Sequence, residues 1–200
     1  MSIVIADTVE FIHVPKTGGC WIEEVCRPWA KIVSATGRHW TGRCTNLPTF
    51  CVERYPMDWF RSLRAYTFRR WEPPAYGNWL KDTEYRAIGT LKTLRDKRAT
   101  AEDVILEYVG RMPGEWSRAT LEWYESSDEL ISFYNLQQGL IGFLRRHQVS
   151  VVSKIEKRAK VTPPVNVSPR APAGDNHAEA SNLLWETEHQ WYDYVAARSI

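Results

Sequence analysis

The chain has 200 residues, which is long enough for one domain with a sizeable core, and no repeat or linker divides it. Hydrophobic residues at 44% and charged residues at 25% are typical of a soluble globular protein, and the net charge of +2 is too small to indicate a nucleic-acid partner. No apolar run approaches the length of a transmembrane helix. We therefore expect residues 1–200 to form a single domain that binds neither nucleic acid nor a membrane.

The first recognisable pattern in the chain is a strand, a turn and a helix. Alternating apolar residues from Val9 to Val14 predict a buried strand, and apolar residues at helical spacing from Trp21 predict a helix. The Pro-Lys-Thr-Gly-Gly sequence at residues 15–19 predicts a tight turn, because glycines permit a sharp backbone path. A lysine beside a glycine turn and a helix N-terminus can hold a phosphate group. We therefore expect an anion-binding loop here, with His13 packed beside it.

The position of the lysine distinguishes this loop from a Walker A loop. That motif places lysine after the last glycine, whereas Lys16 precedes Gly18 and Gly19. No other segment supplies the Walker A pattern, and no pair of acidic residues is spaced to hold Mg²⁺ in the manner of those proteins. A phosphate loop of a different kind is therefore expected.

Further strands and helices alternate along the chain. Strands are expected at residues 31–34, 49–54, 130–134 and 149–152, and helices after Asp58 and over residues 100–109, 136–147 and 181–197. Residues 71–99 show no clear pattern. Strands that alternate with helices favour a three-layer α/β fold with a central parallel sheet.

A second candidate motif follows the expected strand at residues 49–54. Residues 54–62 have the spacing R-x-P-x-D-x-x-x-S. An arginine at a strand end can bind a phosphate through two parallel hydrogen bonds, and a serine one turn into the following helix can add a hydroxyl. Arg54 and Ser62 are therefore candidate phosphate ligands.

Both motifs resemble those of the sulfotransferases that use 3′-phosphoadenosine 5′-phosphosulfate (PAPS), in particular the carbohydrate branch of that family. The family has a P-loop NTPase-like fold, and its phosphosulfate loop reads roughly I-P-K-T-G-G-T. The resemblance implies that the 5′-phosphosulfate of PAPS is bound by Lys16, Thr17, Gly18, Gly19, Cys20 and Trp21. It also implies that Arg54 and Ser62 bind the 3′-phosphate, and that Lys16 neutralises the charge on the leaving group. Cys20 stands where the family usually has threonine or serine, so one hydroxyl contact is lost.

Two further segments extend the resemblance. Family members often carry a histidine followed two residues later by threonine or serine, and His39 precedes Thr41 in this way. We expect His39 to be the general base, because an imidazole that titrates near neutrality suits proton removal from an acceptor hydroxyl. Glu53 is a second candidate base. An N-x-S segment lies just before Arg170, and the resemblance implies that Arg170 adds positive charge near the 3′-phosphate.

The cysteines are expected to be reduced thiols without a metal, although a bridge between Cys44 and Cys51 is also open. None of the four is spaced as C-x-x-C, and no paired histidines accompany them, so zinc is not expected. The N-terminus lacks the basic stretch and apolar run of a signal peptide. The membrane anchor of Golgi relatives is also not seen, and we therefore expect a cytoplasmic enzyme.

The sequence thus favours a PAPS-dependent sulfotransferase that transfers a sulfuryl group to an acceptor hydroxyl, with a carbohydrate acceptor implied by the family branch. One alternative is a nucleotide-dependent kinase with a divergent phosphate loop, which would need ATP and Mg²⁺. Another is a non-catalytic protein that binds a nucleotide or a glycan on the same fold. Phenol, lipid and peptide tyrosine acceptors also stay open, and the oligomeric state is not indicated.

Overall fold

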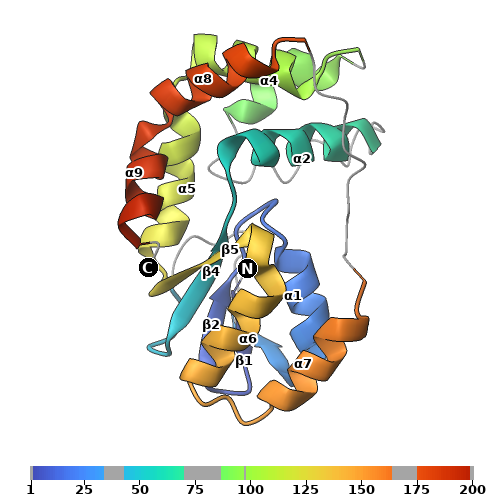
Figure 1. Ribbon diagram of the computed structural model, residues 1–200, viewed down its shortest axis with the longest axis vertical. Helices are drawn as coiled ribbons and strands as arrows, with labels where there is room; N and C mark the ends of the chain where they lie inside the picture. The colour runs from blue at the N-terminus through green and yellow to red at the C-terminus, as the bar shows by residue number, and fades with distance from the viewer. Residues whose placement is uncertain (1, 34–42, 70–86, 97, 164–174, 199–200) are drawn as a thin grey trace. The chain divides into compact units, whose positions relative to one another are not determined.

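The computed structural model describes two compact units of the chain (Figure 1). The described residues are 2–33, 43–69, 87–96, 98–163 and 175–198. Unit 1 is drawn from residues 1–54, 121–167 and 198–200, and unit 2 from residues 55–120 and 168–197. Each unit is described by itself below, and the expectation of a single domain over residues 1–200 stays a prediction.

Unit 1 contains a five-stranded sheet in the order β3-β1-β2-β4-β5. The strands are β1 (Ser2–Ile5), β2 (Val9–Ile12), β3 (Ala30–Ile32), β4 (Thr49–Glu53) and β5 (Glu129–Ser132). Strand β1 is antiparallel to both of its neighbours, whereas β2, β4 and β5 pair in parallel. The protein is therefore an α/β protein with a mixed sheet.

The expected parallel sheet is wrong at β1, which the sequence pattern did not indicate. Only three residues, Ala6 to Thr8, separate β1 from β2. So short a connection can join only antiparallel strands, because a parallel crossover needs about a dozen residues or more. Ala6 and Asp7 adopt φ angles of 49° and 54°, the left-handed conformation of a tight hairpin turn. The three-layer arrangement stays a prediction.

Three helices cover one face of this sheet (Figure 1). They are α1 (Gly19–Cys26), α6 (Leu136–Arg146) and α7 (Val152–Val161). The ring of Phe50 on β4 lies 5.1 Å from that of Phe11 on β2 and 4.5 Å from that of Phe143 on α6. Short 3₁₀ turns, η1 (Arg27–Trp29) and η5 (Phe133–Asn135), follow α1 and β5.

The strand expected at residues 149–152 is wrong, since α7 begins there. Val149 is buried in the core of unit 1, and the N–H of Val152 donates to its carbonyl oxygen at 3.1 Å. A short apolar run has the same pattern whether it is a buried strand or the entry to a helix. The apolar character of these residues therefore serves the turn before α7.

Unit 2 is built from helices around an aromatic core. Its elements are α2 (Pro56–Arg69), η3 (Ile88–Thr90), η4 (Thr93–Arg95), α4 (Ala101–Arg111), α8 (His177–Thr187) and α9 (His189–Arg198), and α5 (Glu115–Glu125) begins in it. Trp59, Trp116 and Trp191 are fully buried, and the ring of Trp116 lies within 6 Å of both others, at 5.9 Å and 5.6 Å. Aromatic pairs at these distances contribute beyond their buried area, which accounts for part of the high tryptophan content.

The start of α4 confirms the helix start expected from the sequence. Thr100 accepts a hydrogen bond from the backbone N–H of Asp103, and the Asp103 carboxylate accepts one from the backbone N–H of Thr100. This capping box satisfies two N–H groups that a helix leaves without intrahelical partners. The helix expected after Asp58 begins two residues earlier, at Pro56, so Asp58 lies inside the first turn of α2.

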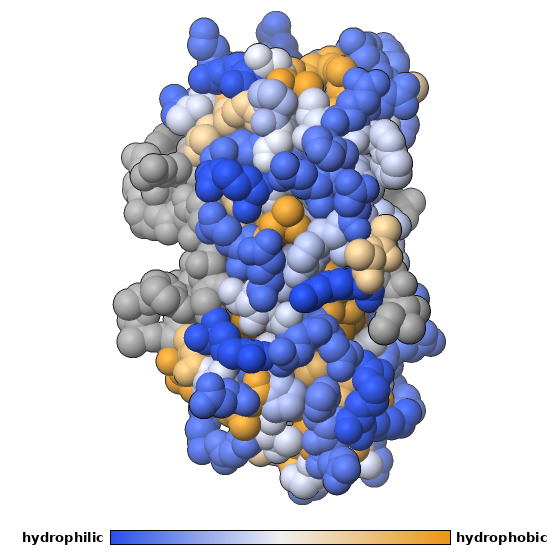
Figure 2. All heavy atoms as spheres, turned by 90° about the vertical axis from the view of Figure 1, so that its left-hand side faces the viewer, coloured by the Kyte–Doolittle hydropathy of each residue, from blue (hydrophilic) through white to orange (hydrophobic). Residues whose placement is uncertain are grey.

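Polar side chains cover most of the surface seen in Figure 2, and apolar ones are scattered in small groups. Within the described part of the chain, no helix is long and apolar enough to cross a membrane.

Candidate functional site

The loop between β2 and α1 makes the tight turn that the sequence predicted. Lys16 and Gly18 both adopt left-handed backbone conformations, with φ angles of 66° and 93°. The Thr17 hydroxyl is buried and donates to the carbonyl oxygen of Val14 at 2.9 Å. The N–H of Trp21 donates to the carbonyl oxygen of Gly18 at 2.9 Å. The loop is therefore fixed by its own hydrogen bonds, and the N–H of Trp21 has an acceptor inside the turn.

Each glycine of the loop is required for a different physical reason. A Cβ atom on Gly18 would lie 2.9 Å from Cδ2 of Leu136, and the φ angle of 93° strains any other residue. A Cβ atom on Gly19 would lie 2.2 Å from Cδ2 of His13. Gly18 thus permits the turn, and Gly19 makes room for the His13 ring.

The N-terminus of α1 has the properties of an anion site. Gly18 caps the helix without any side-chain hydrogen bond, and no acidic residue lies in the first turn. The first N–H groups of a helix have no intrahelical acceptor, and they carry the positive end of the helix dipole. Lys16 adds an ammonium group to the same loop. A phosphate or sulfate group placed here would be bound by backbone N–H groups and a cation.

Arg54 brings the second motif to this loop. Strands β2 and β4 are neighbours and parallel, so their carboxyl ends lie at the same edge of the sheet. From the end of β4, Nη1 of Arg54 donates to the carbonyl oxygen of Lys16 at 2.8 Å. The guanidinium carbon also lies 4.1 Å from the centroid of the Phe133 ring. The two sequence motifs therefore meet within unit 1.

The strand order gives this edge of the sheet a further property. The chain leaves β2 and returns at β3 on one side, whereas it leaves β4 and returns at β5 on the other side. At such a switch point the connections diverge, and ligands of open α/β sheets bind in the crevice that is left. Lys16 and Arg54 stand on the two diverging connections.

Glu53 is a buried carboxyl group next to Arg54. Its side chain accepts a hydrogen bond from Ser132, and its Oε2 atom is buried without a hydrogen-bond partner among the described residues. Burial raises the pKa of Glu53, and the bond from Ser132 offsets this only in part. A carboxyl group with a raised pKa at the edge of a candidate site is better suited to take up a proton than an ordinary carboxylate.

His13 does more than pack beside the loop. His13 is 7% exposed, and its Nδ1 atom pairs with Oε1 of Glu23. The ring is also hydrogen-bonded to the side chain of Cys20. Burial alone would lower the pKa of His13, but the hydrogen bonds and negative charges of Cys20 and Glu23 outweigh it, so the pKa is raised. The sequence analysis did not connect these three residues.

The structure places two of the remaining expected site residues, Trp21 and Ser62. Trp21 is buried, and its Nε1 atom donates to the carbonyl oxygen of Thr162 at 3.2 Å, so it serves packing. Ser62 lies on α2 and belongs to unit 2. His39 and Arg170 lie outside the described residues.

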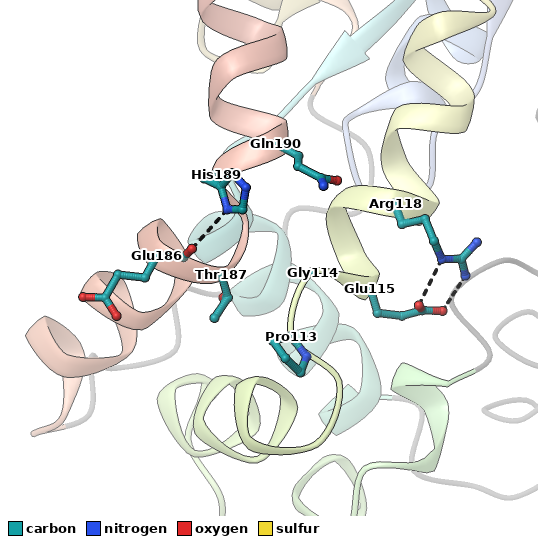
Figure 3. A pocket seen from close by; sticks show the side chains of 8 residues that line it. All are labelled: Pro113, Gly114, Glu115, Arg118, Glu186, Thr187, His189 and Gln190. Carbon is teal, nitrogen blue, oxygen red and sulfur yellow. Dashed lines mark hydrogen bonds and ion pairs between the residues drawn. The ribbon is translucent and has the colours of Figure 1, made fainter.

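Unit 2 contains a surface hollow of about 490 Å³ (Figure 3), and none of the described residues expected to bind the nucleotide lines it. It is lined by Pro113, Gly114, Glu115, Arg118, Glu186, Thr187, His189 and Gln190. Glu115 and Arg118 pair with each other across one turn of α5, with Nη2 to Oε1 at 2.6 Å. Nδ1 of His189 lies 3.2 Å from the carbonyl oxygen of Glu186. These contacts stabilise the helix ends that form the hollow.

All four cysteines are free thiols, so the bridge between Cys44 and Cys51 is not formed. Among the described residues, no group of three or more histidine, cysteine or acidic side chains is arranged to hold a metal ion. Comparisons with protein-family models, with curated proteins and with solved structures find no match to this chain.

Proposed function

We propose that the protein is a PAPS-dependent sulfotransferase. The observation that carries this proposal is the hydrogen bond of 2.8 Å from Arg54 to the carbonyl oxygen of Lys16. It joins two motifs, 38 positions apart, that were matched separately to the 5′-phosphosulfate loop and the 3′-phosphate arginine of one family. A chance match of two short motifs gives no reason for them to meet at one edge of a sheet.

In the proposed reaction the acceptor oxygen attacks the sulfur atom of PAPS. A new S–O bond forms to the acceptor, and the S–O bond to the 5′-phosphate breaks, which leaves adenosine 3′,5′-bisphosphate. The ammonium of Lys16 and the N–H groups at the start of α1 would stabilise the charge that develops on the leaving phosphate oxygen. Arg54 would bind the 3′-phosphate, and Ser62 and Arg170 are further proposed ligands of that group.

The acceptor proton needs a base. His39 is our first candidate from the sequence, and the buried carboxyl group of Glu53 is supported by its raised pKa and its position beside Arg54. A sugar hydroxyl is the proposed acceptor, since the loop is most similar to that of the carbohydrate branch. We also propose a cytoplasmic location.

Calorimetry with two nucleotides tests the proposal directly. Adenosine 3′,5′-bisphosphate is titrated without metal, ATP is titrated with Mg²⁺, and both titrations are repeated on Lys16→Met. We expect metal-free binding of the bisphosphate that Lys16→Met weakens at least tenfold, followed by detectable sulfuryl transfer from PAPS to a panel of sugars. A preference for ATP with Mg²⁺ would support a kinase instead. Binding without any transfer would support the non-catalytic alternative, and no binding of either nucleotide would remove the donor site altogether.

A further inference from the structure

Three side chains around the start of α1 form a chain of hydrogen bonds. Cys20 is the second residue of α1 and is partly exposed. Its side chain is hydrogen-bonded to the ring of His13, and Nδ1 of that ring pairs with Oε1 of Glu23. A nucleophile, a base and a group that orients the base, each within hydrogen-bond reach of the next, is the signature of an activated nucleophile.

The fold holds the His13 ring rigidly between its two partners. The ring stacks on Phe11 with centroids 5.9 Å apart and planes at 23°. On the other side it occupies the space that a side chain on Gly19 would need, since a Cβ atom there would lie 2.5 Å from Nε2 of His13. The imidazole is therefore positioned by packing, and its pairing with Glu23 favours the protonated form that can partner a thiolate.

The other cysteines differ from Cys20 in their surroundings. Burial raises the pKa of Cys26 and of Cys51 to about 12, which makes both thiols inert. Cys44 is exposed, but its pKa is also raised, by desolvation and by Glu10. Only Cys20 combines access to solvent with a helix N-terminus and an imidazolium, the two features that favour the thiolate.

We propose that Cys20 is a nucleophilic thiolate that reacts with hydroperoxides, activated by His13 and Glu23. The sulfur attacks one peroxide oxygen, an S–O bond forms and the O–O bond breaks. The sulfur is oxidised to a sulfenic acid, the peroxide is reduced, and the departing hydroxide or alkoxide takes the proton of the His13 imidazolium to become water or an alcohol. This inference rests on three side chains of unit 1 and does not depend on the proposed sulfotransferase activity.

Competitive labelling tests the proposal, because the labelling rates of all four cysteines are measured in the same sample. The native protein is treated briefly with iodoacetamide between pH 5 and pH 10, and each cysteine is quantified by peptide mass spectrometry. We expect Cys20 to be labelled about tenfold faster than Cys44 at pH 7, because an ordinary thiol is only a few per cent ionised there. Hydrogen peroxide with dimedone should give its adduct at Cys20. Faster labelling of the more exposed Cys44 would overturn the proposal.

Matched substitutions separate activation from simple access. His13→Gln should slow the labelling of Cys20 about tenfold at pH 7 and move its half-maximal pH up to that of an ordinary thiol, near 8.5. Glu23→Gln should give a smaller shift in the same direction. Glu24→Gln is the control, because Glu24 lies next to Glu23 on α1 but pairs with Arg27 and with Arg158 of α7. Unlabelled Cys26 and Cys51 show that each variant is folded, and an unchanged Cys20 profile in folded His13→Gln would refute the activation.

Discussion

Arg54 offers a prediction whose size can be worked out from its contacts. Its guanidinium donates to the carbonyl oxygen of Lys16 at 2.8 Å and lies 4.1 Å from the centroid of the Phe133 ring. A hydrogen bond from a charged donor contributes roughly 1.5–3 kcal/mol, and a cation–π contact about 1 kcal/mol. Arg54→Ala should therefore lower the free energy of unfolding by about 2–4 kcal/mol, which urea denaturation measures.

The same substitution should affect two nucleotides differently. Loss of the bond to Lys16 loosens the loop, and this weakens the binding of adenosine 5′-monophosphate and of adenosine 3′,5′-bisphosphate equally. Only the bisphosphate should also lose a charged hydrogen bond to its 3′-phosphate, which is worth roughly 1.5–3 kcal/mol. Calorimetry should therefore show that Arg54→Ala costs the bisphosphate about 10- to 100-fold more affinity than the monophosphate.

Two control variants make this difference interpretable. Arg54→Lys keeps the charge but loses the planar fork, so we expect an intermediate loss. Arg43→Ala removes another arginine of unit 1, which donates to Oγ1 of Thr49 at 2.6 Å and pairs with Asp128. It should reduce stability without changing either affinity. Equal losses for the two nucleotides in Arg54→Ala would show that Arg54 only supports the loop and does not bind the 3′-phosphate.

The structure leads to two further predictions, and the sequence to a third. Gly18→Ala should destabilise the protein by about 2 kcal/mol in urea denaturation, because the left-handed conformation strains alanine and its Cβ would contact Leu136; an unchanged midpoint would contradict the turn. Burial alone would raise the pKa of Glu107, but hydrogen bonds from the backbone N–H groups of residues 93 and 92 lower it to about 2. Glu107→Gln should therefore lower the free energy of unfolding by about 2 kcal/mol at pH 7. This loss should shrink as the pH falls from about 4.5 towards 2, because the carboxylate of the wild type becomes protonated there. If the loss of unfolding free energy stayed constant down to pH 3, the pKa of Glu107 would not be lowered in the folded protein. His39→Ala should abolish sulfuryl transfer while bisphosphate binding is kept; if only Glu53→Gln has this effect, Glu53 is the base.

The sequence predicted the strand, tight turn and helix around residues 9–26 because the signals for these elements are local. Lysine and glycines between an apolar strand and an amphipathic helix specify a turn that depends on few distant residues. The first hairpin had no such signal, because Ala6 and Asp7 adopt positive φ angles without the Asn-Gly or Asp-Gly pair that usually marks this turn. The core contacts of β1 and β2 evidently outweigh that local strain.

The link between His13, Cys20 and Glu23 was beyond sequence reasoning for a different reason. Cys20 and Glu23 are three residues apart on a helix, so their shared face can be read from the spacing. The direction of His13 depends on how the loop folds back, and this is set by the left-handed conformations of Lys16 and Gly18. A side-chain cluster that spans a turn can be predicted only after the backbone path of the turn is known.

One experiment can test the two proposals together, because both concern the N-terminus of α1. A phosphate bound at the start of α1 would place negative charge beside the Cys20 thiolate, and two like charges at such distances repel by more than 1 kcal/mol. Binding and ionisation are then coupled reciprocally. Saturating adenosine 3′,5′-bisphosphate should raise the half-maximal pH for labelling of Cys20 by about one unit, whereas adenosine should leave it unchanged. Mere steric shielding would slow labelling at every pH without moving the midpoint. An unmoved midpoint and an unchanged labelling rate with bisphosphate bound would place the phosphate away from α1, and the thiolate assignment would stand without an anion site there.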